Sequence, residues 1–167
     1  ISVKLSALHP RFEQGQRERV LQELTPRLLE LAQLAKANHL ALTVDSEEAD
    51  RLRLLLDVFE LVILDPSLQG WNGLGMALQT YQKRAPAVID WLADLAARAD
   101  QRIPLRLVKG AYWDTEIKHA QELWLESYPV FTRKVHTDVS YLACARQALA
   151  AGSATKPATS ASRWLLA

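Results

Sequence analysis

Short apolar runs that alternate with stretches of helical periodicity are the feature that most limits what this chain can fold into. Residues 1–5, 40–44 and 103–108 are rich in Val, Ile and Leu, have the length of strands and end at turn-forming or polar residues. Stretches between them carry apolar residues three or four positions apart, as amphipathic helices do. Such alternation predicts βαβ units around a parallel sheet. It fits both an open doubly wound sheet and a (β/α)8 barrel, and in both architectures ligands bind at the carboxyl ends of the strands.

Shorter signals predict the remaining elements. Thr25-Pro26 interrupts the first helical stretch with a helix start signal, which predicts either two helices or one that re-initiates at Pro26. Ser46 is placed to cap the helix that follows the second strand. We expect helices over residues 16–39, 48–64, 87–99, 115–126 and 137–150, with further short strands over 76–79 and 128–131.

Charge and cysteine content exclude several classes of function. The 20 Lys and Arg residues are balanced by 19 Asp and Glu residues, so there is no basic field for non-specific nucleic-acid binding. Cys144 is the only cysteine, which rules out an intrachain disulfide and is typical of a reducing compartment. No apolar run reaches the roughly 20 residues of a spanning helix, and we expect a cytoplasmic protein. The chain has 167 residues and begins at Ile1, inside an apolar run and without an initiator Met, so we expect a fragment of a larger protein.

Polar side chains collect just after the predicted strands, where parallel sheets carry their chemistry. They are Lys4, Asp45, Gln79, Arg106, Lys109, Tyr112 and Lys134. Four are cationic and one is a carboxylate, so we expect an electropositive pocket that suits an anionic ligand or a phosphate-bearing cofactor. None belongs to a Ser/His/Asp or Cys/His nucleophilic set. Each has a structural alternative, such as a solvated strand end for the lysines and a helix cap for Asp45.

Other ligand motifs are absent or incomplete. The four histidines are scattered and form no helical two-histidine pair, so we predict no metal site. Gly73-Leu74-Gly75 lacks the third glycine of a dinucleotide-binding fingerprint, and no Walker lysine follows a glycine loop. Trp113 lies among the polar residues; we expect its ring to pack in the core or against a helix, and the alternative is that it reaches a cofactor ring.

Five sequence blocks resemble a known family. They are ISVKLSALHP (residues 1–10), DSEEADRL (45–52), QTYQKR (79–84), RLVKGAYWD (106–114) and TRKV (132–135). In this order they resemble the proline dehydrogenase domain of the bifunctional bacterial proline utilization A flavoenzymes. The resemblance covers about residues 1–151.

The resemblance implies a fold and an activity. The implied fold is a (β/α)8 barrel of which residues 1–151 form a part, without the first strand and without the last strands and helix. Residues 152–167 have no counterpart, and we expect a flexible tail there. The implied activity is FAD-dependent oxidation of L-proline to Δ1-pyrroline-5-carboxylate, with electrons passed to quinone. We further expect an NAD-dependent aldehyde dehydrogenase domain on the parent chain, no nucleic-acid contact from this segment, and peripheral association with the inner face of the bacterial plasma membrane.

The resemblance also implies roles for individual residues. Lys4 matches a lysine that holds the proline carboxylate, and Asp45 matches an aspartate that shapes and gates the substrate pocket. Arg106 matches a residue near the N5 edge of the isoalloxazine ring, and it forms the implied catalytic set together with Asp45 and Tyr112. The implied cofactor residues are Gln79, Arg106, Val108, Gly110, Ala111, Tyr112, Thr132 and Lys134, of which Thr132 and Lys134 contact FAD farther from the ring.

Two alternatives stay open. The family's His-Asn motif and the paired arginines of its last helix are not visible after Ala151. The chain is therefore also consistent with a truncated, catalytically inactive remnant of such an enzyme. The cationic strand ends alone are consistent with a non-flavin barrel that binds a small anion.

Overall fold

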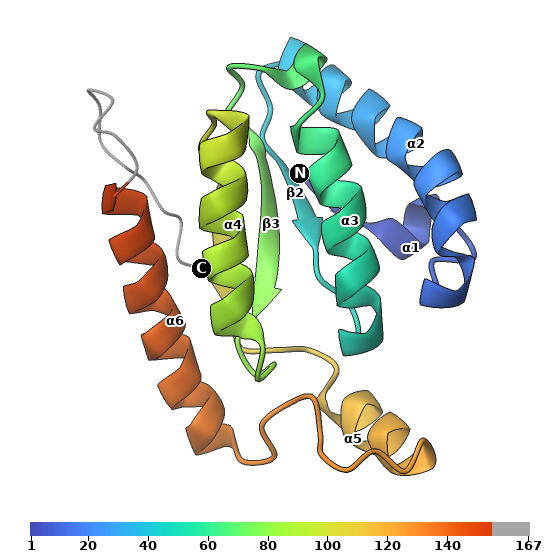
Figure 1. The fold of residues 1–167 in the computed structure, drawn as a ribbon, viewed down its shortest axis with the longest axis vertical. Helices are drawn as coiled ribbons and strands as arrows, with labels where there is room; N and C mark the ends of the chain where they lie inside the picture. Colours follow the sequence, from blue (N-terminus) through green and yellow to red (C-terminus); the bar gives the residue numbers. More distant parts are fainter. Residues whose placement is uncertain (155–167) are drawn as a thin grey trace. The chain divides into compact units, whose positions relative to one another are not determined.

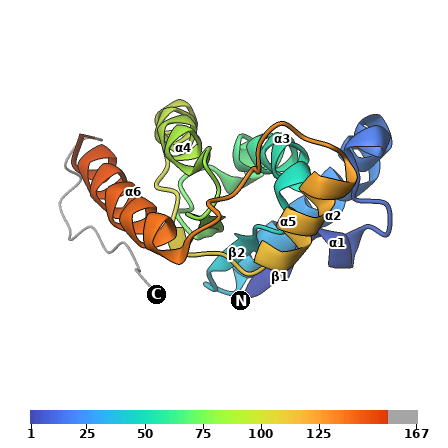
Figure 2. The same ribbon diagram turned by 90° about the horizontal axis from the view of Figure 1, so that it is seen from below.

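The chain forms two compact units in a computed structural model that describes residues 1–154 (Figures 1 and 2). The first unit contains Ile1–Ala77 and Leu95–Pro104, and the second contains Leu78–Asp94 and the described residues from Leu105 onward. The elements are β1 (Ser2–Lys4), α1 (Leu5–Leu8), η1 (Gln14–Gln16), α2 (Arg17–Ala37), β2 (Leu42–Asp45), η2 (Ala49–Arg51), α3 (Leu52–Ile63), η3 (Pro66–Leu68), β3 (Leu74–Gln79), α4 (Ala85–Ala99), β4 (Leu105–Val108), α5 (Trp113–Glu122) and α6 (Lys134–Ala154).

The strands form one sheet in the order β1-β2-β3-β4. β1 pairs with β2, and β2 with β3, in parallel. Met76 N–H donates to the C=O of Pro104 (3.0 Å) and Thr80 N–H to the C=O of Val108 (2.7 Å), so β3 and β4 also run in the same direction. This confirms the predicted α/β fold with a parallel sheet, while a closed barrel stays a prediction.

Two helices supply most of the core of the first unit. α2 and α3 lie side by side (Figure 1) and bury Leu24, Leu28, Val58 and Phe59 completely. α2 is one continuous helix that contains Pro26, so the alternative of two helices is wrong. Because proline has no N–H, the carbonyl one turn earlier loses its helical donor. The helix continues because packing of its buried face outweighs one missing hydrogen bond.

Two features of the first unit depend on long-range contacts. The Ser46 hydroxyl donates to the C=O of Ala77 and so ties the residue after β2 to β3, while its role as a helix cap stays a prediction. Gly75 lies where the chain entering β4 passes closest, because a Cβ there would be 2.2 Å from the carbonyl oxygen of Pro104. Only glycine allows this approach of two backbones.

Three further expectations are corrected in the second unit. Residues 128–131 form no strand and make only an isolated antiparallel bridge, between Gln82 and Val130. α5 ends at Glu122 because Trp124 adopts a left-handed backbone (φ 53°) and Leu125 N–H reaches back to the C=O of Ala120 (3.0 Å), which is a helix-ending motif. α6 runs from Lys134 to Ala154, so Gly152–Ala154 continue the helix. The rest of the predicted tail lies outside the described residues.

Neither membrane spans nor metal clusters are found among residues 1–154. No helix in this part of the chain is both long and apolar enough to cross a bilayer. Its His, Cys, Asp and Glu side chains form no group of three or more that could hold a metal ion.

Candidate functional site

Opposite charges meet on neighbouring strands of the first unit. The parallel register pairs Lys4 of β1 with Asp45 of β2, and each is the last residue of its strand. Paired residues of adjacent strands place their side chains on the same face, with the backbones about 4.8 Å apart. Leu42 and Val44 are buried on the opposite face of β2, so this face is the less buried one. The structure therefore brings together the two predicted substrate residues at the carboxyl ends of β1 and β2.

A buried carboxylate ties the two strand ends together. Glu47 is only 5% exposed and accepts hydrogen bonds from the backbone N–H of Ser6 (3.1 Å) and from the Ser6 hydroxyl. The Arg51 guanidinium lies 3.6 Å from the same carboxylate. Buried carboxylates need such partners, because their desolvation is otherwise costly. Glu47 thus connects the chain two residues after Lys4 to the chain two residues after Asp45.

In the second unit, β4 presents two predicted cofactor residues on one face. Leu105 and Leu107 are buried, whereas Arg106 and Val108 alternate with them and are partly exposed. This two-residue period places Arg106 and Val108 on the same side of the strand. Their side chains are therefore accessible to a ligand, while the leucines anchor the strand in the core.

The loop after β4 is held by the residue that ends β3. Gln79 is buried, and its amide oxygen accepts a hydrogen bond from the backbone N–H of Ala111 (2.9 Å). Gly110 has φ +149°, a conformation that favours glycine, and a Cβ there would lie 2.4 Å from the ring of Tyr81. Gly110 and Ala111 are exposed, so this loop offers its backbone to the surface. The predicted cofactor residues Gln79, Gly110 and Ala111 lie together.

Tyr112 closes the same loop. It directly precedes α5, and its carbonyl accepts the N–H of Glu116 (2.9 Å) in the first turn of that helix. Its side chain is partly exposed. Tyr112 therefore follows Gly110 and Ala111 directly in the chain and lies at the start of α5.

A charge cluster links this loop to the start of α6. Asp138 Oδ1 lies 2.6 Å from the Lys109 ammonium, and Asp138 Oδ2 lies 2.8 Å from the Lys134 ammonium. The hydrogen bond from Lys109, followed by that from Lys134, lowers the pKa of the Asp138 carboxyl, and the same contact with Asp138 raises the pKa of Lys109. Lys134 is 78% exposed, so its ammonium can also meet a ligand.

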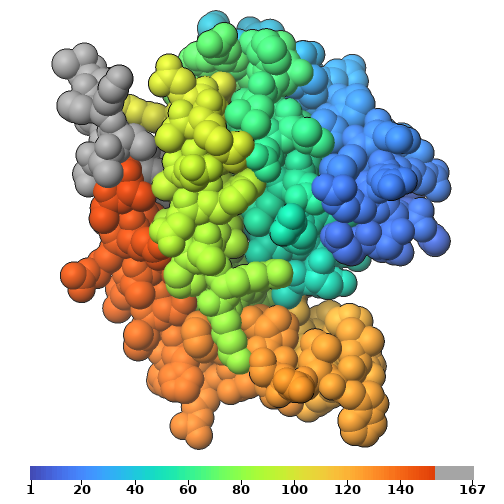
Figure 3. Space-filling view, in the orientation of Figure 1, coloured from blue at the N-terminus to red at the C-terminus, as the bar shows by residue number. Residues whose placement is uncertain are grey.

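Thr132 lies in the segment between α5 and α6, part of which is open on the face drawn in Figure 3. The neighbouring Phe131 donates its N–H to the C=O of Tyr81 (2.8 Å) and accepts the indole N–H of Trp113 (3.1 Å). Trp113 is 43% exposed, so the expectation that its ring packs in the core is wrong. Thr132 itself is exposed.

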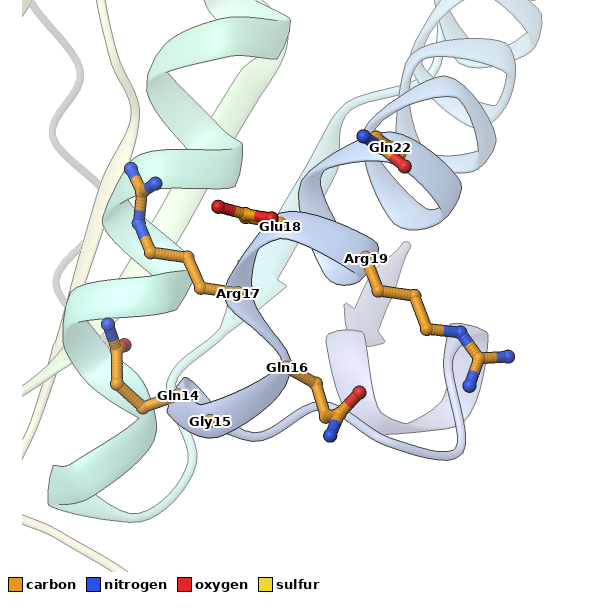
Figure 4. Close-up of a pocket in the computed structure, with 7 residues that line it drawn as sticks. All are labelled: Gln14, Gly15, Gln16, Arg17, Glu18, Arg19 and Gln22. Carbon is orange, nitrogen blue, oxygen red and sulfur yellow. The ribbon is translucent and has the colours of Figure 1, made fainter.

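All eight predicted cofactor residues belong to the second unit, whereas Lys4 and Asp45 belong to the first. An open hollow elsewhere on the first unit involves none of them (Figure 4). It lies at the start of α2, and its two arginines already have partners, since Arg17 pairs with Asp57 and Arg19 with Glu23. The hollow is therefore not the predicted site.

Comparisons with known proteins define the family. The family model described as "Proline dehydrogenase" matches residues 1–163, and the chain belongs to this family. The bifunctional protein PutA of Salmonella typhimurium is 59% identical over 150 residues, which are 90% of this chain and 11% of that protein. The chain thus spans about a tenth of the length of the curated relatives it matches. The predicted resemblance to the proline dehydrogenase domain of proline utilization A enzymes is confirmed.

Solved structures agree with this assignment. Proline utilization A from Bradyrhizobium japonicum, solved as a D779Y mutant, is similar with a TM-score of 0.89 and 63% identity. The enzyme from Bdellovibrio bacteriovorus, solved after inactivation by N-propargylglycine, is similar with a TM-score of 0.85 and 28% identity. Each match covers 90% of this chain and 16% of the solved chain.

Three side chains contact the predicted residues or their loops without having been assigned from the sequence. They are Glu47, Tyr81 and Asp138. Glu47 and Tyr81 lie inside the blocks DSEEADRL and QTYQKR, but only the fold shows what they contact. Asp138 follows Lys134 by four positions, which is the spacing of helical ion pairs, so its contact with Lys134 was detectable from the sequence.

Proposed function

We propose that the natural protein carrying this chain oxidises L-proline to Δ1-pyrroline-5-carboxylate with non-covalently bound FAD. The observation that carries the proposal is the proline dehydrogenase family match over residues 1–163. The bifunctional relatives support a link to proline catabolism. We propose further that the sheet belongs to a (β/α)8 barrel, that quinone accepts the electrons, and that an aldehyde dehydrogenase domain lies on the same parent chain.

The residues of the second unit fit the proposed cofactor. Arg106 and Lys134 are accessible cations, Thr132 offers an exposed hydroxyl, and Gly110 and Ala111 expose backbone. Such a set suits a ligand with a flat polar ring and negatively charged phosphates. FAD, when bound, supplies the acceptor for the hydride that leaves proline. We assign its contacts to Gln79, Arg106, Val108, Gly110, Ala111, Tyr112, Thr132 and Lys134.

The chain's own residues have separate proposed tasks. The Lys4 ammonium binds the proline carboxylate, and Asp45 beside it shapes and gates the substrate pocket. Arg106 supplies a fixed cation that stabilises the negative charge developing during reduction, and such preorganised charge favours the transition state. No side chain acts as a nucleophile, because proline oxidation by hydride transfer requires none.

A visible absorbance spectrum tests the proposed function. The natural protein is purified in the presence of FAD, and spectra are recorded before and after anaerobic addition of L-proline. Bound flavin that bleaches is the expected result. Bound flavin that stays oxidised would support an inactive remnant that retains the cofactor half of the site. A protein without flavin would exclude FAD chemistry and leave the small-anion alternative.

Replacing Arg106 with alanine tests its role separately. We expect the rate of flavin reduction to fall by roughly a hundredfold, as when one preorganised charge-stabilising group is removed. The unfolding transition should change little because Arg106 is partly exposed. Arg146→Ala is the matched control, since Arg146 is an exposed arginine of α6 outside the proposed site. Unchanged flavin reduction in Arg106→Ala would refute the assignment.

A further inference from the structure

The turn after β3 connects two segments of the second unit that carry proposed cofactor residues, the loop after β4 and the segment that leads into α6. Thr80 N–H donates to the C=O of Val108 (2.7 Å), and Tyr81 N–H donates to the C=O of Lys109 (2.7 Å). The Tyr81 carbonyl accepts the N–H of Phe131 (2.8 Å). Tyr81 is therefore bonded through its backbone to the loop after β4 on one side and to the segment before α6 on the other.

The ring of Tyr81 also determines the path of the loop after β4. The residue is 3% exposed, and its ring atoms occupy the space that a side chain at position 110 would need, with Cγ 2.4 Å from an ideal Cβ. Gly110 is thus packed with its backbone against the ring, at φ +149°. Because packed interiors leave few voids, removing the ring would leave this stretch of backbone without support.

Two further hydrogen bonds hold residues on either side of Tyr81 in the turn, Thr80 and Lys83. The Ser140 hydroxyl of α6 donates to the C=O of Thr80 (2.7 Å), and Lys83 N–H donates to the C=O of Pro129 (3.0 Å). The turn is therefore bonded to α6 as well as to the two loops. Because the turn is held by α6, it can in turn hold the loop after β4 and the segment before α6 in place.

We propose that Tyr81 is a positioning residue for the cofactor site, an inference that rests on the proposed function. It holds the loop of Gly110, Ala111 and Tyr112 through ring packing, and the segment before Thr132 and Lys134 through its backbone. Tyr81 acts on the cofactor through these segments and is not itself a contact. A displacement of about 1 Å in such a loop is enough to change affinity and turnover by a large factor.

A purely structural role makes a different prediction. If Tyr81 only fills the core, replacing it lowers the melting temperature but leaves FAD affinity and turnover unchanged well below that temperature. If it positions the loops, FAD affinity and turnover change even where the protein is fully folded. The two roles are therefore separable by measurements at low temperature.

The test compares Tyr81→Leu with Phe59→Leu in the natural protein purified with FAD. Phe59 is a fully buried aromatic of α3 in the first unit, so its replacement is a matched loss of core packing in the unit that does not carry the cofactor loops. We expect Tyr81→Leu to raise the Kd of FAD and lower kcat by roughly tenfold or more each, and to change the visible circular dichroism of the bound flavin. Phe59→Leu should lower the melting temperature with Kd and kcat within about twofold of wild type. Tyr81→Phe keeps the ring and should recover most of the loss.

A second variant covers the case in which Tyr81→Leu does not fold. Gly110→Ala adds a Cβ against the same ring from an exposed loop position, and it should weaken FAD binding by a similar factor. Unchanged FAD affinity and turnover in Tyr81→Leu, or unchanged FAD affinity in Gly110→Ala, would overturn the proposal. A wild-type protein that binds no FAD would overturn the proposed function and this inference together, so the two failures are distinguishable.

Discussion

Replacing Glu47 with glutamine should loosen the carboxyl ends of β1 and β2. The carboxylate is 5% exposed and accepts two hydrogen bonds from Ser6, one from its backbone N–H at 3.1 Å and one from its hydroxyl. Glutamine has nearly the same shape, but it is neutral and its amide has only one acceptor oxygen. The glutamine oxygen can still accept the Ser6 N–H, but the NH₂ group can only donate, so the Ser6 hydroxyl would have to turn and accept from it.

The expected loss follows from the number and type of bonds. Hydrogen bonds to a charged group contribute about 1.5–3 kcal/mol each, and a neutral one contributes about 0.5–1.5 kcal/mol. Two charge-assisted bonds become two neutral bonds, and the carboxylate's desolvation cost is relieved in part. We therefore expect Glu47→Gln to reduce the local stability of the strand ends by about 1–3 kcal/mol.

Hydrogen exchange measured by mass spectrometry resolves this effect locally, which matters because the chain has two units. Under conditions where exchange reports opening equilibria, about 1–3 kcal/mol corresponds to roughly 5- to 140-fold faster exchange. The increase should appear in peptides that contain Ser6 and Val44. Glu48→Gln is the matched control, because Glu48 is 28% exposed and its contact with Arg51 (3.4 Å) is of the weak surface type. Equal exchange in the two variants would refute the role of Glu47.

Three further predictions concern single residues. Pro26→Ala should raise the stability of the chain against urea by about 1–3 kcal/mol, because the helix interior regains a backbone donor and loses the proline penalty; an unchanged midpoint would contradict this. In carbon-13 NMR titrations the Asp138 carboxyl should have a pKa below its usual 3.8, and Lys109→Met should raise it. Because the pKa of Asp138 is lowered and that of Lys109 is raised, the stabilisation from their contact should be lost as pH falls through the carboxyl pKa and as pH rises through the ammonium pKa. Burial raises the pKa of the Cys144 thiol, so it should react with DTNB far more slowly in the folded chain than in urea, and equal rates would contradict its burial.

β2 and β4 were predictable because each has one buried and one less buried face, whereas β3 is buried on both faces. In β2 the buried residues are Leu42 and Val44, and in β4 they are Leu105 and Leu107. Alternation of this kind is visible in the sequence and already implies that Arg106 lies on the other face. The pairing of Lys4 with Asp45 was not predictable in the same way, because register depends on how two distant strands align.

Local signals failed where a distant partner competed with them. The Ser46 hydroxyl donates to the carbonyl of Ala77 on the neighbouring strand, a contact that the local sequence does not reveal. Residues 128–131 have the composition of a strand, but their backbone is used elsewhere, since the carbonyl of Pro129 accepts the N–H of Lys83. Trp124 ends α5 in a conformation that sequence rules reserve for glycine or asparagine. For Ser46 and residues 128–131 the deciding contact is visible only in the fold, whereas α5 ends at the local hydrogen bond from Leu125 N–H to the C=O of Ala120.

The residues assigned from the sequence and those found in the structure should differ in how they respond to substitution. Lys4 and Lys134 are exposed at strand or helix ends, so neutralising them removes a proposed ligand contact at little cost in stability. Glu47 and Tyr81 are buried, and each is bonded to a segment that carries proposed site residues: Glu47 to the chain just after Lys4, and Tyr81 to the chain just before Thr132. Replacing either should therefore change folding and function together. Activity data alone would therefore assign Glu47 and Tyr81 to the site and stability data alone would assign them to the core. Only measurements of both, on variants matched for burial, separate a residue that positions the site from one that merely fills the fold.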